Sequence, residues 1–316
     1  QVELDAQVKP GAQVKPAAKH KKSNALLNVM IAISAIAMIG ALGLIAYPTF
    51  SDWWNRMHQS YAVAGYVEQT KDMSGAERKA MLKAAHEYNE RLAANGDRWH
   101  MTDAQKREYN ETLDVTGTGI MGYVTIPRIK VKLPVYHGTS DGVLQIAAGH
   151  LAGTSLPVGG ATTHAVVSGH TGLPSARLLT GLDELKKGDT FAFHVLDETY
   201  TYQVDQISVV LPSEISKLNI ESGADYATLI TCTPYGVNSH RLLVRGHRIP
   251  NPKVPDKTQY DEPGEMTAVA AAVIGLLVFV AGCAFVGLAR LWRRSWIVRH
   301  GLCAGAGARH SSGVRG

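Results

Sequence analysis

The sequence has few cysteines and lacks the short motifs that signal metal or nucleotide chemistry. It contains three cysteines in 316 residues, and no C-x-x-C, H-E-x-x-H or glycine-rich phosphate-binding string. Cofactors and metal ions are therefore not expected at its functional site. Only Cys232 lies between the two long apolar segments; Cys283 lies inside one of them and Cys303 in the C-terminal tail. Cys232 has no expected disulfide partner within the chain, so it is either a buried inert side chain or a reactive group.

Acidic residues are also missing from one end of the chain, where the basic surplus gathers. Residues 290–316 carry six arginines and no Asp or Glu, and residues 1–24 carry five lysines against two acids. These ends contribute +6 and +3, which leaves −4 for residues 25–289 in a chain of net charge +5. Because the positive charge flanks apolar segments, it indicates membrane topology, and nucleic acid is not an expected partner.

Two uncharged apolar runs, residues 25–47 and 267–289, separate these ends from the middle of the chain. Each exceeds the ~20 residues that cross a ~30 Å hydrocarbon core as a helix. The first is also compatible with an uncleaved signal peptide, although its apolar length is large for one. The positive-inside rule places both termini in the cytoplasm and exports about residues 48–266. We therefore expect a multi-pass protein of the cell membrane whose middle region faces the extracellular side.

The region that follows the first apolar run has helical patterns. Residues 51–73 are predicted to continue as a helix. Two capping boxes, in which a Ser or Thr and a Glu or Gln satisfy the free amides at a helix start, predict further helices from residues 74–77 and 102–105. The first of these helices is expected to end at Asn95-Gly96, and the second to reach Leu113.

From Gly119 the sequence changes to short strands separated by Gly, Pro and Asp. Strands are predicted over residues 122–126, 165–168, 190–196, 199–210, 226–232 and 241–248, with Asp197-Glu198 as the turn of a hairpin. So many short strands over about 130 residues predict a sandwich or a closed barrel rather than a parallel α/β sheet.

The thiol of Cys232 stands at the end of a predicted strand, in the string TLITCTPYG. Side chains alternate along a strand, so Cys232 shares a face with Ile230, and Thr233-Pro234 leaves the thiol at a rim. The short connection to the next strand allows Arg241 to lie beside Cys232, where a guanidinium would favour a thiolate or hold a developing oxyanion. Spacing alone favours the alternative, in which Arg241 and Arg245 are ordinary solvated charges on the strand.

His170 is the candidate among thirteen histidines. It follows the apolar stretch Ala165-Val166-Val167 and precedes Thr171-Gly172, which puts it at a second rim position. An imidazole there would exchange protons with a leaving amine. A lone histidine is more often structural, and the residues alone leave both roles open.

Three strings together resemble the sortase family. TLITCTPYGVNSHRLLVRGHR, residues 228–248, is similar to the sortase active-site signature, and most similar to that of the pilus-building class C enzymes. AVVSGHTGLPSARLLTGLDELKKGD, residues 165–189, resembles the family's histidine segment. MGYVTIPRIKVKLPVYHG and GHLAGTSLPVGG resemble its opening strands, so that the resemblance covers roughly residues 85–250.

This resemblance implies a mainly β fold, the eight-stranded sortase barrel with short helices. It implies that Cys232 is the nucleophile, His170 the proton donor and acceptor, and Arg241 the oxyanion-stabilising residue. Such enzymes cut an LPxTG-type sorting signal after its threonine and form a thioacyl intermediate on the cysteine. An amine then resolves the intermediate, in class C enzymes typically a lysine of the next pilin subunit. The implied partners are pilins with LPxTG signals and a pilin lysine or cell-wall amine.

Class C sortases also commonly carry a lid motif, Asp-Pro-aromatic, ahead of the barrel. Asp97-Arg98-Trp99 stands at the matching position between two predicted helices, with Arg98 in place of the proline. We expect Trp99 to lie over Cys232 and Asp97 to approach Arg241 or its neighbours, in a loop with little else that would bury it. Because no proline fixes φ at Arg98, the lid is expected to open readily. The alternative is a solvated interhelical loop.

Three alternative interpretations of the sequence are weighed against a class C sortase. L,D-transpeptidases usually place their cysteine in a Ser-x-Gly-Cys-x-Arg string, which residues 228–233 lack. A housekeeping sortase that attaches proteins to the cell wall is disfavoured by the second apolar run and the lid-like loop. A non-enzymatic pilus-associated membrane protein would have no need for Cys232, His170 and Arg241 to converge.

The sequence thus divides into seven predicted parts. They are a basic cytoplasmic arm (1–24), a transmembrane helix (25–47), an extracellular helical region with the lid (48–118), the catalytic barrel (119–250), a linker (251–266), a second transmembrane helix (267–289) and a basic cytoplasmic tail (290–316).

Overall fold

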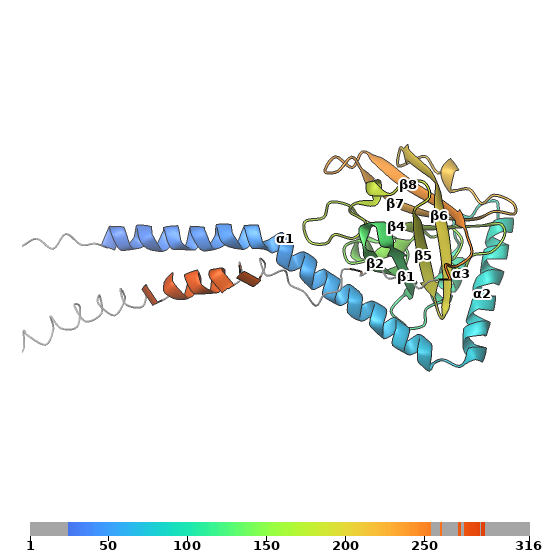
Figure 1. Ribbon diagram of the computed structural model, residues 1–316, viewed down its shortest axis with the longest axis horizontal. Helices are drawn as coiled ribbons and strands as arrows, with labels where there is room; N and C mark the ends of the chain where they lie inside the picture. Colours follow the sequence, from blue (N-terminus) through green and yellow to red (C-terminus); the bar gives the residue numbers. More distant parts are fainter. Residues whose placement is uncertain (1–24, 254–259, 261–270, 273–274, 285, 288–316) are drawn as a thin grey trace, which may run out of the picture. The chain divides into compact units, whose positions relative to one another are not determined.

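The computed structural model describes residues 25–253, 260, 271–272, 275–284 and 286–287 (Figure 1). The chain divides into two compact units, residues 43–276 and a second unit of residues 1–42 with 277–316. The predicted arm and tail lie outside the described residues, as does most of the linker. Of the second predicted span, the described part includes an apolar helix at Gly275–Ala284. The predicted domain boundaries stay predictions.

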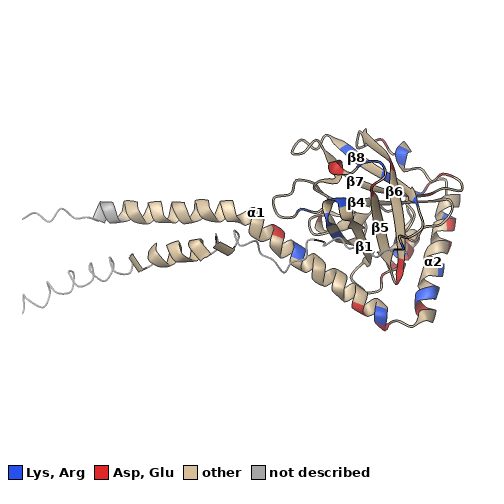
Figure 2. Cartoon of the chain, in the orientation of Figure 1, with Lys and Arg blue, Asp and Glu red and all other residues tan. Residues whose placement is uncertain are grey.

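The first predicted span and its continuation form a single helix, α1 (Ala25–Asp72), with Pro48 inside it. No charged side chain occurs in α1 before Asp52, as Figure 2 shows. Within the described residues α1 is the one helix long and apolar enough to cross a membrane, with a mean hydropathy of 2.5 over its apolar window. Length and composition therefore agree with a membrane anchor near the N-terminus.

Both capping boxes form as predicted. Helix α2 (Gly75–Ala94) begins at Ser74, whose hydroxyl accepts from the Glu77 amide while the Glu77 carboxylate accepts from the Ser74 amide. Helix α3 (Asp103–Glu111) begins in the same way at Thr102. It ends two residues before the predicted Leu113, which adopts a positive φ of 69°. A left-handed residue cannot continue an α-helix, so the chain turns there toward the barrel.

The predicted barrel is confirmed as a closed barrel of eight strands in the order β1-β2-β3-β4-β7-β8-β6-β5 (Figure 1). Two neighbouring pairs, β2–β3 and β4–β7, are parallel and the others are antiparallel. The strands are β1 (Ile120–Ile126), β2 (Val131–His137), β3 (Ala148–His150), β4 (Thr163–Ser168), β5 (Thr190–Val195), β6 (Glu198–Val210), β7 (Asp225–Thr233) and β8 (His240–Arg248). Short helical turns connect them: η1 (Pro127–Ile129), α4 (Asp141–Leu144), η2 (Leu182–Glu184) and η3 (Ser216–Leu218).

Alternation along the strands fills the barrel with one face of each strand. Leu229, Leu242 and Val244 belong to the main core, whereas Ile230 and Leu243 belong to a separate cluster. Because β7 and β8 pair with Ile230 opposite Leu243, the second cluster lies on the outer face of these strands. Cys232 follows Ile230 by two residues and shares this outer face.

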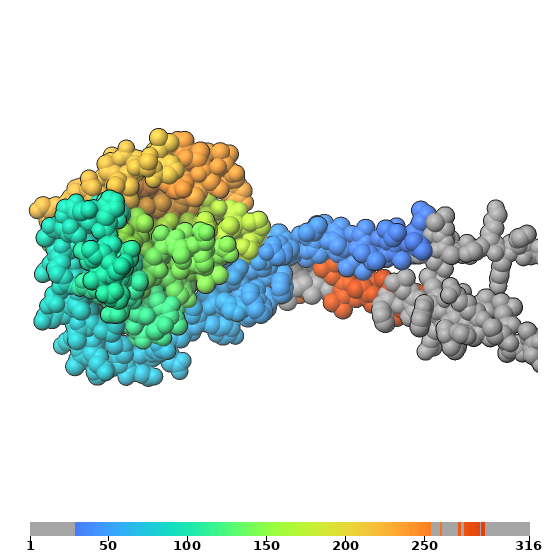
Figure 3. Space-filling model, turned by 180° about the vertical axis from the view of Figure 1, so that it is seen from behind, coloured from blue at the N-terminus to red at the C-terminus, as the bar shows by residue number. Residues whose placement is uncertain are grey.

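The helices are fastened to the barrel by buried polar contacts. The Tyr66 hydroxyl on α1 donates to the Met121 carbonyl at 3.2 Å and accepts from the Leu196 amide at 2.7 Å. Asn89 on α2 donates to the Leu156 carbonyl and accepts from its amide, at 3.0 and 2.7 Å. Seen from behind, α2 and the segment after it cover one side of the barrel (Figure 3). These contacts hold the helical region against the barrel that carries the site.

Candidate active site

The strand register brings Cys232 and Arg241 together. They are Cα partners near the end of the antiparallel pair β7–β8, and both are half-buried. Directly opposite residues in an antiparallel pair have Cβ atoms ~4.5–5.5 Å apart, so the two side chains leave the sheet side by side. The predicted neighbourhood of thiol and guanidinium is therefore present in the fold.

His170 reaches the same edge of the barrel from β4. Strands β4 and β7 run parallel with Ser168 opposite Ile230, and this register, continued by two residues, sets His170 level with Cys232. The Gly169 amide donates to the Ile230 carbonyl at 3.0 Å, which extends the pairing beyond the strand. Parallel strands end at one edge, so the fold gathers His170, Cys232 and Arg241 there.

Thr231 holds the backbone just before His170, a role that was not predicted from the sequence. Its hydroxyl, which is buried, donates to the Gly169 carbonyl at 2.8 Å. The residue before Cys232 thus holds the residue before His170. The one sequence signal for this role was the alternation of side chains along the strand, which places Thr231 on the side of β7 opposite to Cys232.

Gly172 permits a second contact between the two edges of the site. Its φ is +72°, and a Cβ atom there would stand 2.7 Å from Cε2 of Tyr235, in the turn after β7. Such a distance is too short for any side chain, and the positive φ favours glycine as well. The loop that carries His170 therefore packs closely on the turn that follows Cys232.

The two arginines on the outer face of β8 differ in their surroundings. The Arg241 Nη1 donates to the carbonyls of Asn238 and His240 at 3.2 and 3.1 Å. Arg245 donates from two nitrogens to both carboxylate oxygens of Asp205, at 3.1 and 3.2 Å, and lies 4.0 Å from the centre of the Tyr226 ring. Arg245 is thus a structural residue rather than a solvated charge, whereas Arg241 is turned toward the strand end.

Asp97 does not make its expected approach to Arg241. Its carboxylate pairs with the His100 ring at 2.7 Å, and both side chains are largely exposed. Asp97 and His100 are three residues apart in the turn that follows α2, so the imidazole is a local partner for the carboxylate. An ion pair so exposed contributes little to stability, so Asp97 is not what holds the loop.

Arg98 corrects the expectation of a weakly held loop, because it is buried, with 8 % of its surface exposed. Its guanidinium donates to the Gly153 and Leu218 carbonyls at 3.2 and 3.1 Å and to the Asn219 side chain at 3.3 Å. Burial lowers the pKa of Arg98. A long side chain with five donors reaches carbonyls that a proline cannot, so Arg98 anchors the loop where a proline would only restrict φ.

Trp99 packs on the outer face of β7 and β8. The Arg98 guanidinium lies 4.5 Å from the centre of its ring. Trp99 contacts the outer apolar cluster formed by Val166, Leu218, Ile230 and Leu243. Ile230 is two residues from Cys232 on the same face, so this cluster extends toward the site. That the indole covers the thiol stays a prediction.

Two other histidines are buried in structural roles. His150 is fully buried and bonded to the Tyr109 hydroxyl and the Ser155 carbonyl, and burial lowers its pKa to about 4. Burial also lowers the pKa of His164, which lies between the Asn219 carbonyl and the Thr228 hydroxyl. Across the described ranges, no group of three or more His, Cys, Asp or Glu side chains is placed to hold a metal ion.

Comparisons with known proteins all indicate one family. The family model described as "Sortase domain" matches residues 124–249. The crystal structure of sortase C1 from Streptococcus agalactiae is 52% identical, with a TM-score of 0.60; the match covers 61% of this chain and all of that one. Sortase C from Streptococcus pneumoniae is 46% identical, with a TM-score of 0.55, over 60% of this chain and 97% of that one.

A curated relative, Sortase A of Streptococcus agalactiae, is 30% identical over 117 residues, or 36% of this chain. The match spans about half of that relative's length, 47%.

A closed eight-stranded barrel with a cysteine, a histidine and an arginine at one edge defines a sortase-type cysteine transpeptidase fold. The chain belongs to the sortase family, and the two solved structures compared above are of sortase C enzymes.

Proposed function

We propose that the chain is a membrane-anchored, pilus-building sortase that cleaves LPxTG-type signals through Cys232. The observation that carries this proposal is the pairing of Cys232 with Arg241 across β7 and β8, with His170 at the end of the strand beside them. Nucleophilic catalysis needs a thiol, a proton carrier and a stabiliser of negative charge at one place, and these residues supply the three.

The first half of the reaction forms a thioester. The Cys232 thiol passes its proton to His170, its sulfur attacks the threonine carbonyl carbon of the sorting signal, and the carbonyl oxygen takes up negative charge. The Arg241 guanidinium stabilises this oxyanion. The bond from threonine to glycine then breaks, and His170 gives a proton to the departing glycine amine. The threonine remains bonded to the sulfur.

The second half reverses these roles. A lysine amine attacks the thioester carbonyl, His170 accepts a proton from the amine, and the carbon–sulfur bond breaks. An amide joins threonine to lysine, and His170 passes its proton to the departing sulfur, which restores the thiol of Cys232. No cofactor is needed, because the thioester conserves the energy of the cleaved amide for the new one.

Pilins are the proposed substrates. The Streptococcus pneumoniae relative is described as giving insight into pilin substrate specificity, and it is 46% identical to this chain. The charge distribution supports two membrane spans with the barrel on the extracellular face, where membrane-tethered pilins would meet it. A lysine of the next pilin is the proposed acceptor, with a cell-wall amine as the alternative that a housekeeping sortase would use.

The test is a transpeptidation assay with the full chain in detergent. An LPxTG peptide is offered with pilin, or with a peptidoglycan stem-peptide amine, and the joined product is measured. We expect joining to pilin, its loss in Cys232→Ala and its retention in Cys283→Ala. Joining to the stem peptide alone would indicate a housekeeping sortase. Joining that persists in Cys232→Ala would contradict the proposed mechanism.

A further inference from the structure

The loop that carries His170 is held from outside the barrel by α1. The Asp52 Oδ1 accepts from the Arg177 amide at 2.7 Å, and the Asn55 Nδ2 donates to the Ser175 carbonyl at 2.8 Å. Residues three apart lie on the same face of a helix, so both contacts come from one side of α1. They join parts of the chain that are 125 and 120 residues apart.

Hydrogen bonds join the two limbs of this loop, residues 170–180, so a contact at its tip also affects the position of its base. The Leu179 amide donates to the His170 carbonyl at 3.1 Å, and the Gly172 amide donates to the Thr180 hydroxyl at 3.0 Å. Between these ties, Leu173 and Ala176 form an isolated bridge. His170 therefore lies on one limb of a narrow loop. Helix α1 is hydrogen-bonded to the tip of the loop at Ser175 and to its other limb at Arg177.

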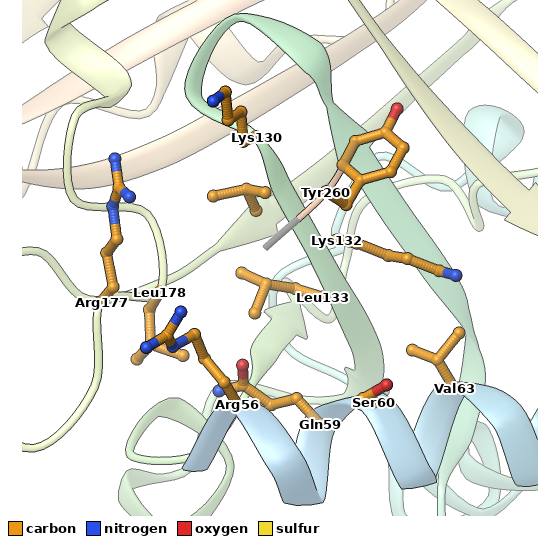
Figure 4. Close-up of a pocket in the computed structure, with 11 residues that line it drawn as sticks. Arg56, Gln59, Ser60, Val63, Lys130, Lys132, Leu133, Arg177, Leu178 and Tyr260 are labelled. Atoms are coloured by element: carbon orange, nitrogen blue, oxygen red, sulfur yellow. The ribbon is translucent and has the colours of Figure 1, made fainter. Parts of the chain in front are cut away.

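The helix and the loop are joined by polar contacts beside a gap in the packing. A cavity of about 40 Å³ lies next to the contacts, lined by Arg56 and Gln59 of α1, by Leu133 of β2, and by Arg177 and Leu178 of the loop (Figure 4). Arg56 also pairs with Asp52 at 3.0 Å, which orients the carboxylate. The hydrogen bonds of Asp52 and Asn55 thus contribute to holding the loop at this level.

We propose that Asp52 and Asn55 are positioning residues for His170. This inference rests on the proposed function, because it assumes that His170 carries the proton. A proton carrier works only within hydrogen-bond reach of the leaving amine, and a displacement of ~1 Å costs up to ~100-fold in rate. The helix that carries the apolar anchor thereby also sets the position of the catalytic loop.

The test compares variants of the full chain in detergent with an LPxTG peptide and pilin. We expect Asp52→Ala with Asn55→Ala to lower kcat by about 10–100-fold while KM changes by less than about threefold, because proton transfer and not binding is impaired. Asp52→Asn keeps an acceptor oxygen for the Arg177 amide and should retain most of kcat. The limb of the pH–rate profile that depends on His170 should shift in the double Ala variant.

Gln59→Ala is the matched control. Gln59 lies on the same helix and lines the same cavity, but its hydrogen bond, at 2.7 Å, goes to the Ile146 carbonyl outside the His170 loop. Its variant should keep kcat near that of the wild type. A double Ala variant with wild-type kcat would overturn the inference, and so would an equal loss in Gln59→Ala, which would indicate a general loosening of α1. Loss of activity in Cys232→Ala with retention in the double variant would leave the proposed function intact.

Discussion

Arg241 and Arg245 show how two identical side chains on one strand face acquire different roles. Arg245 is held by both carboxylate oxygens of Asp205 and lies on the Tyr226 ring, so its geometry is fixed by structure. Arg241 donates from one nitrogen to two backbone carbonyls and stands opposite Cys232. These carbonyls steady the guanidinium at the strand end, where the oxyanion of the proposed reaction forms.

Replacing Arg241 by lysine should therefore impair catalysis severely. Lysine keeps the charge but loses the planar fork of donors. Since loss of one oxyanion donor costs ~10²–10³ in rate, we expect Arg241→Lys to lower kcat/KM by about 100-fold or more. Arg245→Lys is the control, expected to lower stability modestly and turnover little. Turnover of Arg241→Lys near the wild-type rate would exclude the oxyanion role.

At the scale of elements, regular patterns were predicted well and irregular ones were missed. The two capping boxes lie where the sequence predicted them. The same holds for β4, which leads to His170, and for β7 and β8, which contain Cys232 and Arg241. Strands β2 and β3 were not delimited from the residues alone, although the strings that resemble the opening sortase strands cover most of them. Pro134 interrupts the alternation in β2, and β3 is only three residues long, so neither strand shows a clear two-residue period.

The site shows the same division. Sequence placed Cys232, His170 and Arg241 at strand ends, and the register set them at one edge. It could not foresee that Arg98 would be buried, because its acceptors, the carbonyls of Gly153 and Leu218, are 55 and 120 residues away. Long-range backbone partners leave no trace in local spacing.

The loop of residues 97–99 gives a prediction at this scale. Trp99→Ala should accelerate labelling of Cys232 by a bulky thiol reagent, because the indole packs on the same face as the thiol. Arg98→Ala should do so too, since it leaves the buried acceptors of the anchor unpaired. Asp97→Ala should change the rate by less than about twofold, because an exposed ion pair is worth only ~0–1 kcal/mol.

Labelling rates are measured by mass spectrometry on the intact chain under matched conditions. Cys283, in the helix Gly275–Ala284, reports any general change in reactivity and should label equally in all variants. Equal Cys232 rates in wild type, Arg98→Ala and Trp99→Ala would show that this loop does not govern access.

At the scale of the whole molecule, one buried histidine links the helical region to the barrel. His150 on β3 is bonded to Tyr109 of α3 and to the Ser155 carbonyl, and none of its surface is exposed. Burial holds its pKa at about 4 in the folded protein. An unfolded histidine takes up its proton near pH ~6.5.

Stability should consequently fall on acidification. Between pH ~6.5 and pH ~4 the unfolded chain binds a proton at His150 that the folded chain does not, so the free energy of unfolding falls as pH falls through this window. With a folded pKa of about 4, the loss is on the order of 3 kcal/mol at pH 4. Thermal unfolding at pH 7 and pH 4.5 measures it. His150→Gln should be less stable at pH 7 and lose less on acidification; an equal loss would contradict this account.

The central claim is that Cys232 carries the acyl group, and the most direct measurement is mass spectrometry of the trapped intermediate. The full chain in detergent is mixed with an LPxTG peptide without an amine acceptor, quenched in acid and digested. We predict that the peptide up to its threonine adds to the fragment that contains Cys232, that hydroxylamine removes it, and that the fragments with Cys283 and Cys303 stay unmodified. Turnover of the peptide with the adduct on another residue would contradict the account.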